Sequence, residues 1–154
     1  MESNHDAHIH FTDEPILGHK TIDPIGTYTQ YFKENNIRTA FIVFSDAEKF
    51  GKFKKECKTS CPNTDIYGFY WIHDFDDYII PEIADALKTE SFIDNTDISK
   101  MDSVLTADRR NLPIYIHCGE INSELANPLL VKDLAERFKD RKFIIGHSGA
   151  YGPP

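Results

Sequence analysis

Apolar segments of two kinds alternate along this chain, and the alternation limits the folds that are open to it. Runs of aliphatic and aromatic residues, typical of buried strands, are separated by stretches in which apolar residues recur at helical spacing. Units of about 25 residues in this β-α order predict an α/β fold, with a parallel sheet covered by helices. The expected strands are His5–His10, Thr39–Phe44, Ile66–His73, Ser91–Asp94, Pro113–Cys118 and Lys142–His147.

Helix-forming stretches fall between these strands, and each begins with a residue that favours a helix N-terminus. The expected helix starts are Pro24, Asp46, Asp76 or Asp77, Thr96 or Asp97, and Pro128. The third helix is expected to carry apolar residues at helical spacing, namely Ile80, Ile83, Ala84 and Leu87. A chain of 154 residues with this pattern predicts one domain over residues 1–154.

The composition restricts the partners and the compartment that are open to this chain. The formal net charge of −8 argues against nucleic acid and anionic membranes as partners. No apolar run reaches the roughly 18 residues of a membrane span, and the acidic, polar N-terminus does not resemble a signal peptide. The odd number of cysteines (Cys57, Cys61 and Cys118) predicts free thiols in a reducing compartment, so we expect a cytoplasmic protein.

A group of four histidines, His8, His10, His117 and His147, stands at the carboxyl ends of expected strands. His8 and His10 are one residue apart on the first strand, where alternate side chains share a face and the two Cα atoms lie about 6–7 Å apart. His117 is near the end of the fifth strand and His147 ends the sixth. Because α/β folds place their sites at this edge and neutral imidazole is a common zinc ligand, the four predict a metal site. The alternative is four separate histidines that are hydrogen-bonded at strand ends.

Three segments together resemble the amidohydrolase superfamily, in particular its branch of metal-dependent hydrolases and decarboxylases. They are Asp6–His10, Leu112–Glu120 and Ile144–Ala150. The resemblance implies an incomplete (β/α)8 barrel of the TIM type, with about six βα units in this chain. It also implies His8, His10 and His117 as metal ligands, and His147 as a ligand of a second metal or of the substrate.

Two departures from the family pattern modify these expectations. Many members bridge two metals with a lysine on strand four, whereas the expected fourth strand offers Asp94 and no lysine, so we expect one divalent ion, most simply zinc. The family also has an aspartate at the end of strand eight, and the resemblance stops after strand six. The chain is therefore interpreted as a barrel truncated at its C-terminus. Such a barrel has unpaired strand edges, which leaves three interpretations: a fragment of a longer protein, a sheet closed by a second subunit, or strands rearranged into an open sheet. We favour a shortened barrel that associates with itself, so we expect a homo-oligomer.

The function that these residues predict is metal-dependent hydrolysis of an amide, ester or lactone bond of a small molecule by a metal-activated water. The candidate catalytic residues are His147, Glu120 and Asp94. His73, at the end of the third strand, either contacts substrate or is a hydrogen-bonded core histidine. Two alternatives stay open, namely decarboxylation at the same site and an inactive barrel that binds metal or a partner.

Two other enzyme classes match single features of the sequence. Gly146–Ala150 is close to the Gly-x-Ser-x-Gly motif of α/β-hydrolases, with Ser148 as the nucleophile, but neither an acid nor a histidine follows it in this sequence. A histidinol-phosphate-type phosphatase also begins with His-x-His. The acidic composition and the lack of an evident phosphate-binding loop argue against that class.

Overall fold

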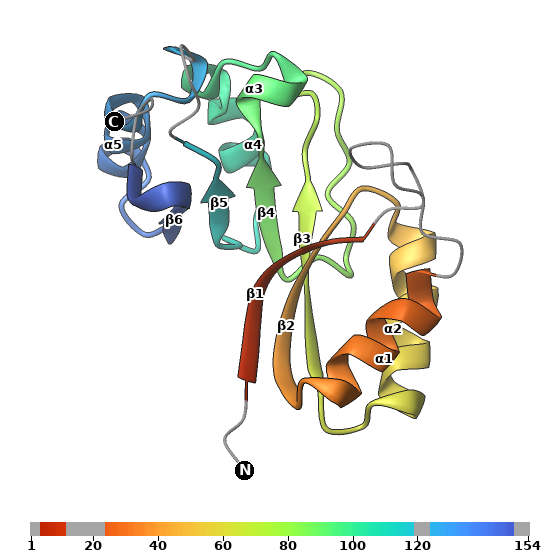
Figure 1. Ribbon diagram of the computed structural model, residues 1–154. Helices are drawn as coiled ribbons and strands as arrows, with labels where there is room; N and C mark the ends of the chain where they lie inside the picture. Colours follow the sequence, from red (N-terminus) through yellow and green to blue (C-terminus); the bar gives the residue numbers. More distant parts are fainter. Residues whose placement is uncertain (1–3, 12–23, 119–123, 150–154) are drawn as a thin grey trace. The chain divides into compact units, whose positions relative to one another are not determined.

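The computed structural model describes residues 4–11, 24–118 and 124–149, which form a mixed α/β fold (Figure 1). Six strands are hydrogen-bonded to their neighbours in chain order, β1-β2-β3-β4-β5-β6. The pairs β1–β2, β4–β5 and β5–β6 are parallel. These findings confirm the α/β class and the parallel pairing that the sequence predicts. The chain divides into two compact units, Met1–Phe69 and Tyr70–Pro154.

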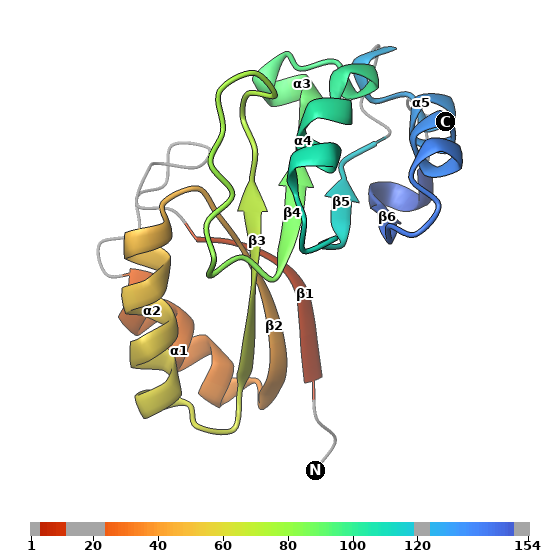
Figure 2. The same ribbon diagram turned by 180° about the vertical axis from the view of Figure 1, so that it is seen from behind.

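The first unit contains two helices that lie side by side (Figures 1 and 2). Its elements are β1 (Asn4–His10), α1 (Pro24–Glu34), β2 (Ile37–Phe44), α2 (Ala47–Ser60) and the start of β3 (Asp65–Trp71). Asp46 caps α2 as expected, because its side chain accepts the Lys49 N–H at 2.9 Å. The core includes four fully buried aromatic rings, Phe32, Phe44, Phe50 and Phe53.

The second unit holds the remaining strands and shorter helical segments. Its elements are β4 (Ala86–Thr89), α3 (Ser91–Asp94), η1 (Ile98–Lys100), α4 (Asp102–Ala107), β5 (Ile114–Ile116), η2 (Glu124–Ala126), α5 (Pro128–Arg137), β6 (Phe143–Ile145) and η3 (Gly146–Gly149). Its core is aliphatic and includes Leu87, Met101, Ile116 and Leu134. Asn127 caps α5 by accepting the Leu129 N–H at 2.9 Å, and Pro128 occupies the first turn as expected. Within the described ranges, no helix is long and apolar enough to span a membrane.

Two sequence-based expectations for residues 76–94 are wrong. The expected third helix is absent from this described segment, and Leu87 lies instead on β4, whose four residues are all buried. The expected strand Ser91–Asp94 is the short helix α3, with Phe92 and Ile93 exposed. Pro81 disfavours a helix through this region because it lacks an N–H. Strand β4 is hard to recognise from the sequence, because its buried residue Lys88 is charged and interrupts the apolar pattern.

The ends of other elements also differ from the expectations. β3, β5 and β6 end at Trp71, Ile116 and Ile145, so the histidines expected on these strands follow them. The expected fourth helix is divided into η1 and α4, although Asp97 caps its start by accepting the Ser99 N–H at 2.9 Å. His117 therefore directly follows β5, whereas His73 lies two residues beyond β3 and His147 lies in η3, two residues beyond β6.

Candidate functional site

Polar side chains follow the carboxyl ends of the strands in the second unit. Glu90 comes directly after β4 and His117 directly after β5, whereas His73 and His147 lie two residues beyond β3 and β6. The carboxyl ends of parallel strands meet at one edge of a sheet, which is the usual place for a binding site in α/β folds. Hydrogen bonds join these residues and their neighbours into two groups.

The first group pairs two imidazoles. His117 Nε2 lies 2.7 Å from His147 Nε2. Gly146 makes this approach possible, because a Cβ at that position would lie 2.6 Å from the Tyr115 hydroxyl and 3.3 Å from His117 Cα. Only a residue without a side chain lets the chain pass this close to β5, and the next residue, His147, is thereby placed beside His117.

Glu90 holds the other nitrogen of His117 and also binds a buried lysine. Its Oε1 lies 2.5 Å from His117 Nδ1, and its Oε2 accepts from Lys88 Nζ at 2.7 Å. Lys88 is fully buried, and its ammonium lies 4.5 Å from the centre of the Trp71 ring. Burial by itself raises the pKa of Glu90, but the hydrogen bonds from His117 and Lys88 outweigh burial and lower this pKa to about 2.

The ionised Glu90 defines the tautomer of His117. A carboxylate only accepts hydrogen bonds, so the geometry assigns the His117 proton to Nδ1. The lone pair of the neutral ring is then on Nε2, the nitrogen that faces His147. This carboxylate–imidazole arrangement is the one that usually orients a histidine toward a metal.

The second group is centred on Asp94, which accepts two hydrogen bonds. Its Oδ2 accepts from Trp71 Nε1 at 2.7 Å, and its Oδ1 lies 2.8 Å from His73 Nδ1. The His73 and Trp71 rings are stacked, with their centroids 4.5 Å apart. The side chain of Asp94 is 7% exposed and that of His73 is 48% exposed, so a buried carboxylate supports an imidazole that is accessible to solvent.

The first unit contains its own pair of imidazoles on β1. His8 Nε2 and His10 Nε2 are 2.9 Å apart, and the two rings are stacked. This geometry agrees with the expectation that alternate residues of the strand share a face. Asp6 accepts from the Tyr31 hydroxyl at 2.7 Å, and Tyr28 donates to the His10 carbonyl at 2.5 Å, so hydrogen bonds connect the strand to α1.

Both pairs resemble part of a metal site in two respects. Their ligands are imidazoles, and the two Nε2 atoms of each pair face each other. Two imidazole ligands of a tetrahedral zinc ion, each about 2.0–2.1 Å from the metal, lie about 3.4 Å apart. The observed separations of 2.7 and 2.9 Å are shorter, so the pairs have to open by about 0.7 and 0.5 Å to admit an ion. No group of three or more His, Cys, Asp or Glu side chains in the described part of the chain is arranged to hold a metal. Each pair by itself therefore supplies two ligands.

The remaining predicted site residues have different outcomes. Asp94 is bonded to Trp71 and His73, and Glu120 lies outside the described residues. The statement that the fourth strand has no lysine is wrong, because β4 is Ala86–Thr89 and includes Lys88. Glu90 is not among the site residues predicted from the sequence. The signal that was available is the Lys-x-Glu spacing, which places opposite charges on one face of a strand.

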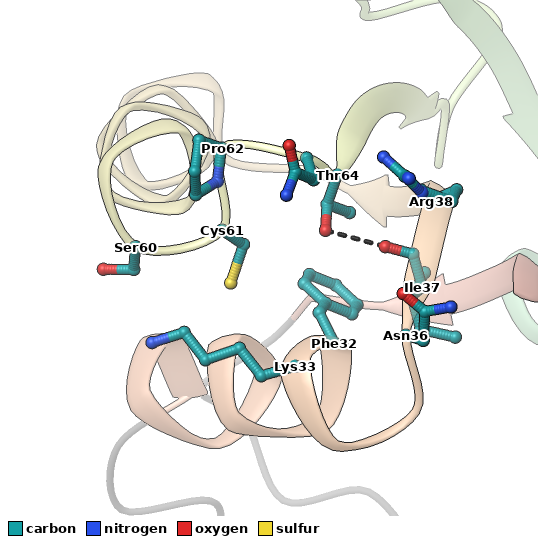
Figure 3. A pocket seen from close by; sticks show the side chains of 10 residues that line it. Phe32, Lys33, Asn36, Ile37, Arg38, Ser60, Cys61, Pro62 and Thr64 are labelled. Carbon is teal, nitrogen blue, oxygen red and sulfur yellow. Dashed lines mark hydrogen bonds between the residues drawn. The ribbon is translucent and has the colours of Figure 1, made fainter. Parts of the chain in front are cut away.

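A separate hollow in the first unit contains none of the predicted site residues. It has a volume of about 310 Å³ and lies beside the C-terminal ends of α1 and α2 (Figure 3). Phe32, Lys33, Arg38 and Cys61 contribute to its lining, and Thr64 Oγ1 donates to the Ile37 carbonyl at 2.8 Å next to it. The hollow is open and holds no cluster of groups with obvious chemistry.

Comparisons of the chain with protein-family models, curated proteins and solved structures find no match.

Proposed function

We propose that this chain is a metal-dependent hydrolase of the amidohydrolase type, built on part of a (β/α)8 barrel, that cleaves an amide, ester or lactone bond of a small molecule. The observation that carries the proposal is His117, which Glu90 holds at Nδ1 while Nε2 faces His147. Ordinary core histidines do not require both a buried ionised carboxylate and a second imidazole at opposite nitrogens.

His117 and His147 are proposed to hold a divalent ion in the second unit, and His8 and His10 are the corresponding candidates in the first. Zinc is the expected metal, because imidazole nitrogen suits it. A divalent ion bound to such nitrogens polarises a carbonyl oxygen and lowers the pKa of water toward about 7.

Glu90 and Lys88 prepare this site before any ligand arrives. Glu90 accepts the Nδ1 proton of His117, which orients the ring and increases the electron density at Nε2. Lys88 stabilises the ionised form of Glu90 through its hydrogen bond, and the ring of Trp71 lies against the same ammonium. The buried ion pair thus keeps the ligand nitrogen of His117 in one tautomer and one orientation.

Metal content tests the proposal directly. We expect purified, zinc-loaded protein to retain zinc after gel filtration, and the double variant His117→Ala/His147→Ala to lose the ion of the second unit. His8→Ala/His10→Ala tests the first pair in the same way. His5→Ala is the matched control, because His5 is an exposed histidine of β1 outside both pairs. Full zinc occupancy in both double variants would refute the proposal.

Activity is then measured on a panel of nitrophenyl esters, anilides and lactones, with and without a chelator. We expect zinc to raise the rate of hydrolysis, and we expect a chelator to remove this zinc-dependent part of the rate. Glu90→Gln should lower zinc affinity about 10–100-fold, the usual effect of removing a carboxylate behind a ligand histidine. Release of CO2 from small carboxylic acids, with no hydrolysis of the panel, would favour decarboxylation instead.

A further inference from the structure

Asp94 carries two hydrogen bonds that are not equivalent. Trp71 Nε1 can only donate, so its bond to Oδ2 has one possible direction. His73 Nδ1, at 2.8 Å from Oδ1, faces a carboxylate that can only accept, so the proton of the neutral ring is assigned to Nδ1. The lone pair of His73 is then on Nε2.

The surroundings separate the two ends of this pair. Asp94 is almost wholly buried, whereas about half of the His73 side chain is exposed. Trp71 both donates to the carboxylate and stacks on the imidazole, so it restricts the positions of both partners. A buried carboxylate that fixes the tautomer of an accessible imidazole is the arrangement of a general base.

We propose that His73 and Asp94 form a proton-transfer dyad, in which His73 Nε2 is the catalytic base and Asp94 is its positioning residue. Nε2 accepts the proton of a water molecule as the water oxygen bonds to the carbonyl carbon of an ester or amide. The same proton is returned to the leaving oxygen or nitrogen as the bond to that carbon breaks. The inference rests on the proposed function only because an ester or amide is taken as the substrate. The dyad itself requires no metal.

The tautomer of His73 is the first readout, measured from the ring ¹⁵N shifts of metal-free protein at a pH at which the imidazole is neutral. The wild type should carry its proton on Nδ1. In Asp94→Asn only one oxygen remains, and Trp71 has to keep it because indole cannot accept. The amide NH2 then faces His73, whose proton moves to Nε2.

A second substitution makes this test specific. In Trp71→Phe/Asp94→Asn no indole N–H is present to donate to the amide oxygen. This oxygen can then accept a hydrogen bond from His73 Nδ1, and the original tautomer should return. Trp71→Phe alone should keep the proton on Nδ1. A wild-type proton on Nε2, or the same tautomer in the wild type and Asp94→Asn, would overturn the assignment.

Reactivity is the second readout, with p-nitrophenyl acetate as the probe and chelator present throughout. We expect His73→Gln to lower the chelator-resistant rate by about 10²-fold, the lower end of what a positioned base contributes. Asp94→Asn should lower the rate as well, the double variant should recover it, and the control His5→Gln should leave it unchanged. A His73→Gln rate equal to that of the wild type would refute the dyad. Because no metal is present, that result is distinct from a failure of zinc binding or zinc-dependent hydrolysis.

Discussion

Replacing Glu90 with glutamine should destabilise the second unit strongly, although the two side chains have nearly the same shape. Lys88 is fully buried and Glu90 is 4% exposed, so their hydrogen bond is shielded from water. Without the carboxylate, Lys88 loses the negative charge that faces it in this buried site. Removing one partner of a buried ion pair typically costs about 3–5 kcal/mol.

The pKa of Glu90 leads to a similar value. It falls from 4.5 to about 2 on folding, because hydrogen bonds from His117 and Lys88 outweigh the effect of burial. Each unit of difference in pKa is equivalent to about 1.4 kcal/mol, so the lowered pKa of Glu90 corresponds to about 3 kcal/mol of stability. A lowered carboxyl pKa stabilises the fold above the pKa of the unfolded chain. This contribution is lost as the pH falls from about 4.5 to about 2.

The assay is urea unfolding of metal-free protein, followed by the fluorescence of Trp71. This is the single tryptophan of the chain, and Lys88 lies against its ring, so it reports on the second unit. At pH 7 we expect the free energy of unfolding of Glu90→Gln to be lower by about 3 kcal/mol. The difference from the wild type should shrink as the pH falls below about 4.5.

Two further variants separate this effect from a general loss of charge. Glu136→Gln removes an exposed carboxylate 3.1 Å from Lys132 and should leave the free energy of unfolding nearly unchanged, because water screens this pair. Lys88→Met/Glu90→Gln removes both buried charges and should recover most of the lost stability, because no charge is left without its partner. The reasoning fails if Glu90→Gln unfolds within about 0.5 kcal/mol of the wild type at pH 7 with an unchanged denaturant slope.

Three other predictions concern packing, a buried guanidinium and the thiols. Gly68→Ala should lower the free energy of unfolding by about 1–3 kcal/mol, measured by circular dichroism, because its Cβ would lie 2.4 Å from the Phe50 ring; an unchanged midpoint would contradict this. Arg141→Met should cost about 3–5 kcal/mol in urea unfolding, because Asp108 loses its buried partner at 2.8 Å; a neutral effect would show that packing compensates. Burial raises the pKa of Cys57 to about 12, so a disulfide reagent at pH 8 should label it only after denaturation, and rapid labelling of folded protein would count against this.

The buried Lys88–Glu90 pair also bears on the proposed chemistry. A charged pair inside a small α/β unit is seldom the most stable solution, and apolar residues of similar volume often replace such pairs without loss. Its position between Trp71 and His117 is better explained by the orientation of an imidazole than by stability. The double variant Lys88→Met/Glu90→Gln is therefore expected to fold well and to bind zinc weakly.

Local patterns in the sequence were sufficient for most of the first unit. The apolar run Thr39–Phe44 lies in β2, and Asp46 caps α2. A buried strand and a helix cap each depend on residues within a few positions of one another, so their signals can be read from a short window. His8 and His10 share a face for the same reason, because alternation is a property of the strand itself.

Only the tertiary structure decided where the fourth strand lies and which residues surround His117. β4 has only four residues and includes the buried Lys88, so its apolar pattern is interrupted at the residue that binds Glu90. Glu90 reaches a histidine 27 positions away, and His147 reaches the same ring from 30 positions beyond it. Glu90 is two residues from Lys88, but the Trp71 ring and His117, which complete this group, come from other strands or their ends. The sequence contains each of these residues, but their proximity follows from the pairing of β4, β5 and β6.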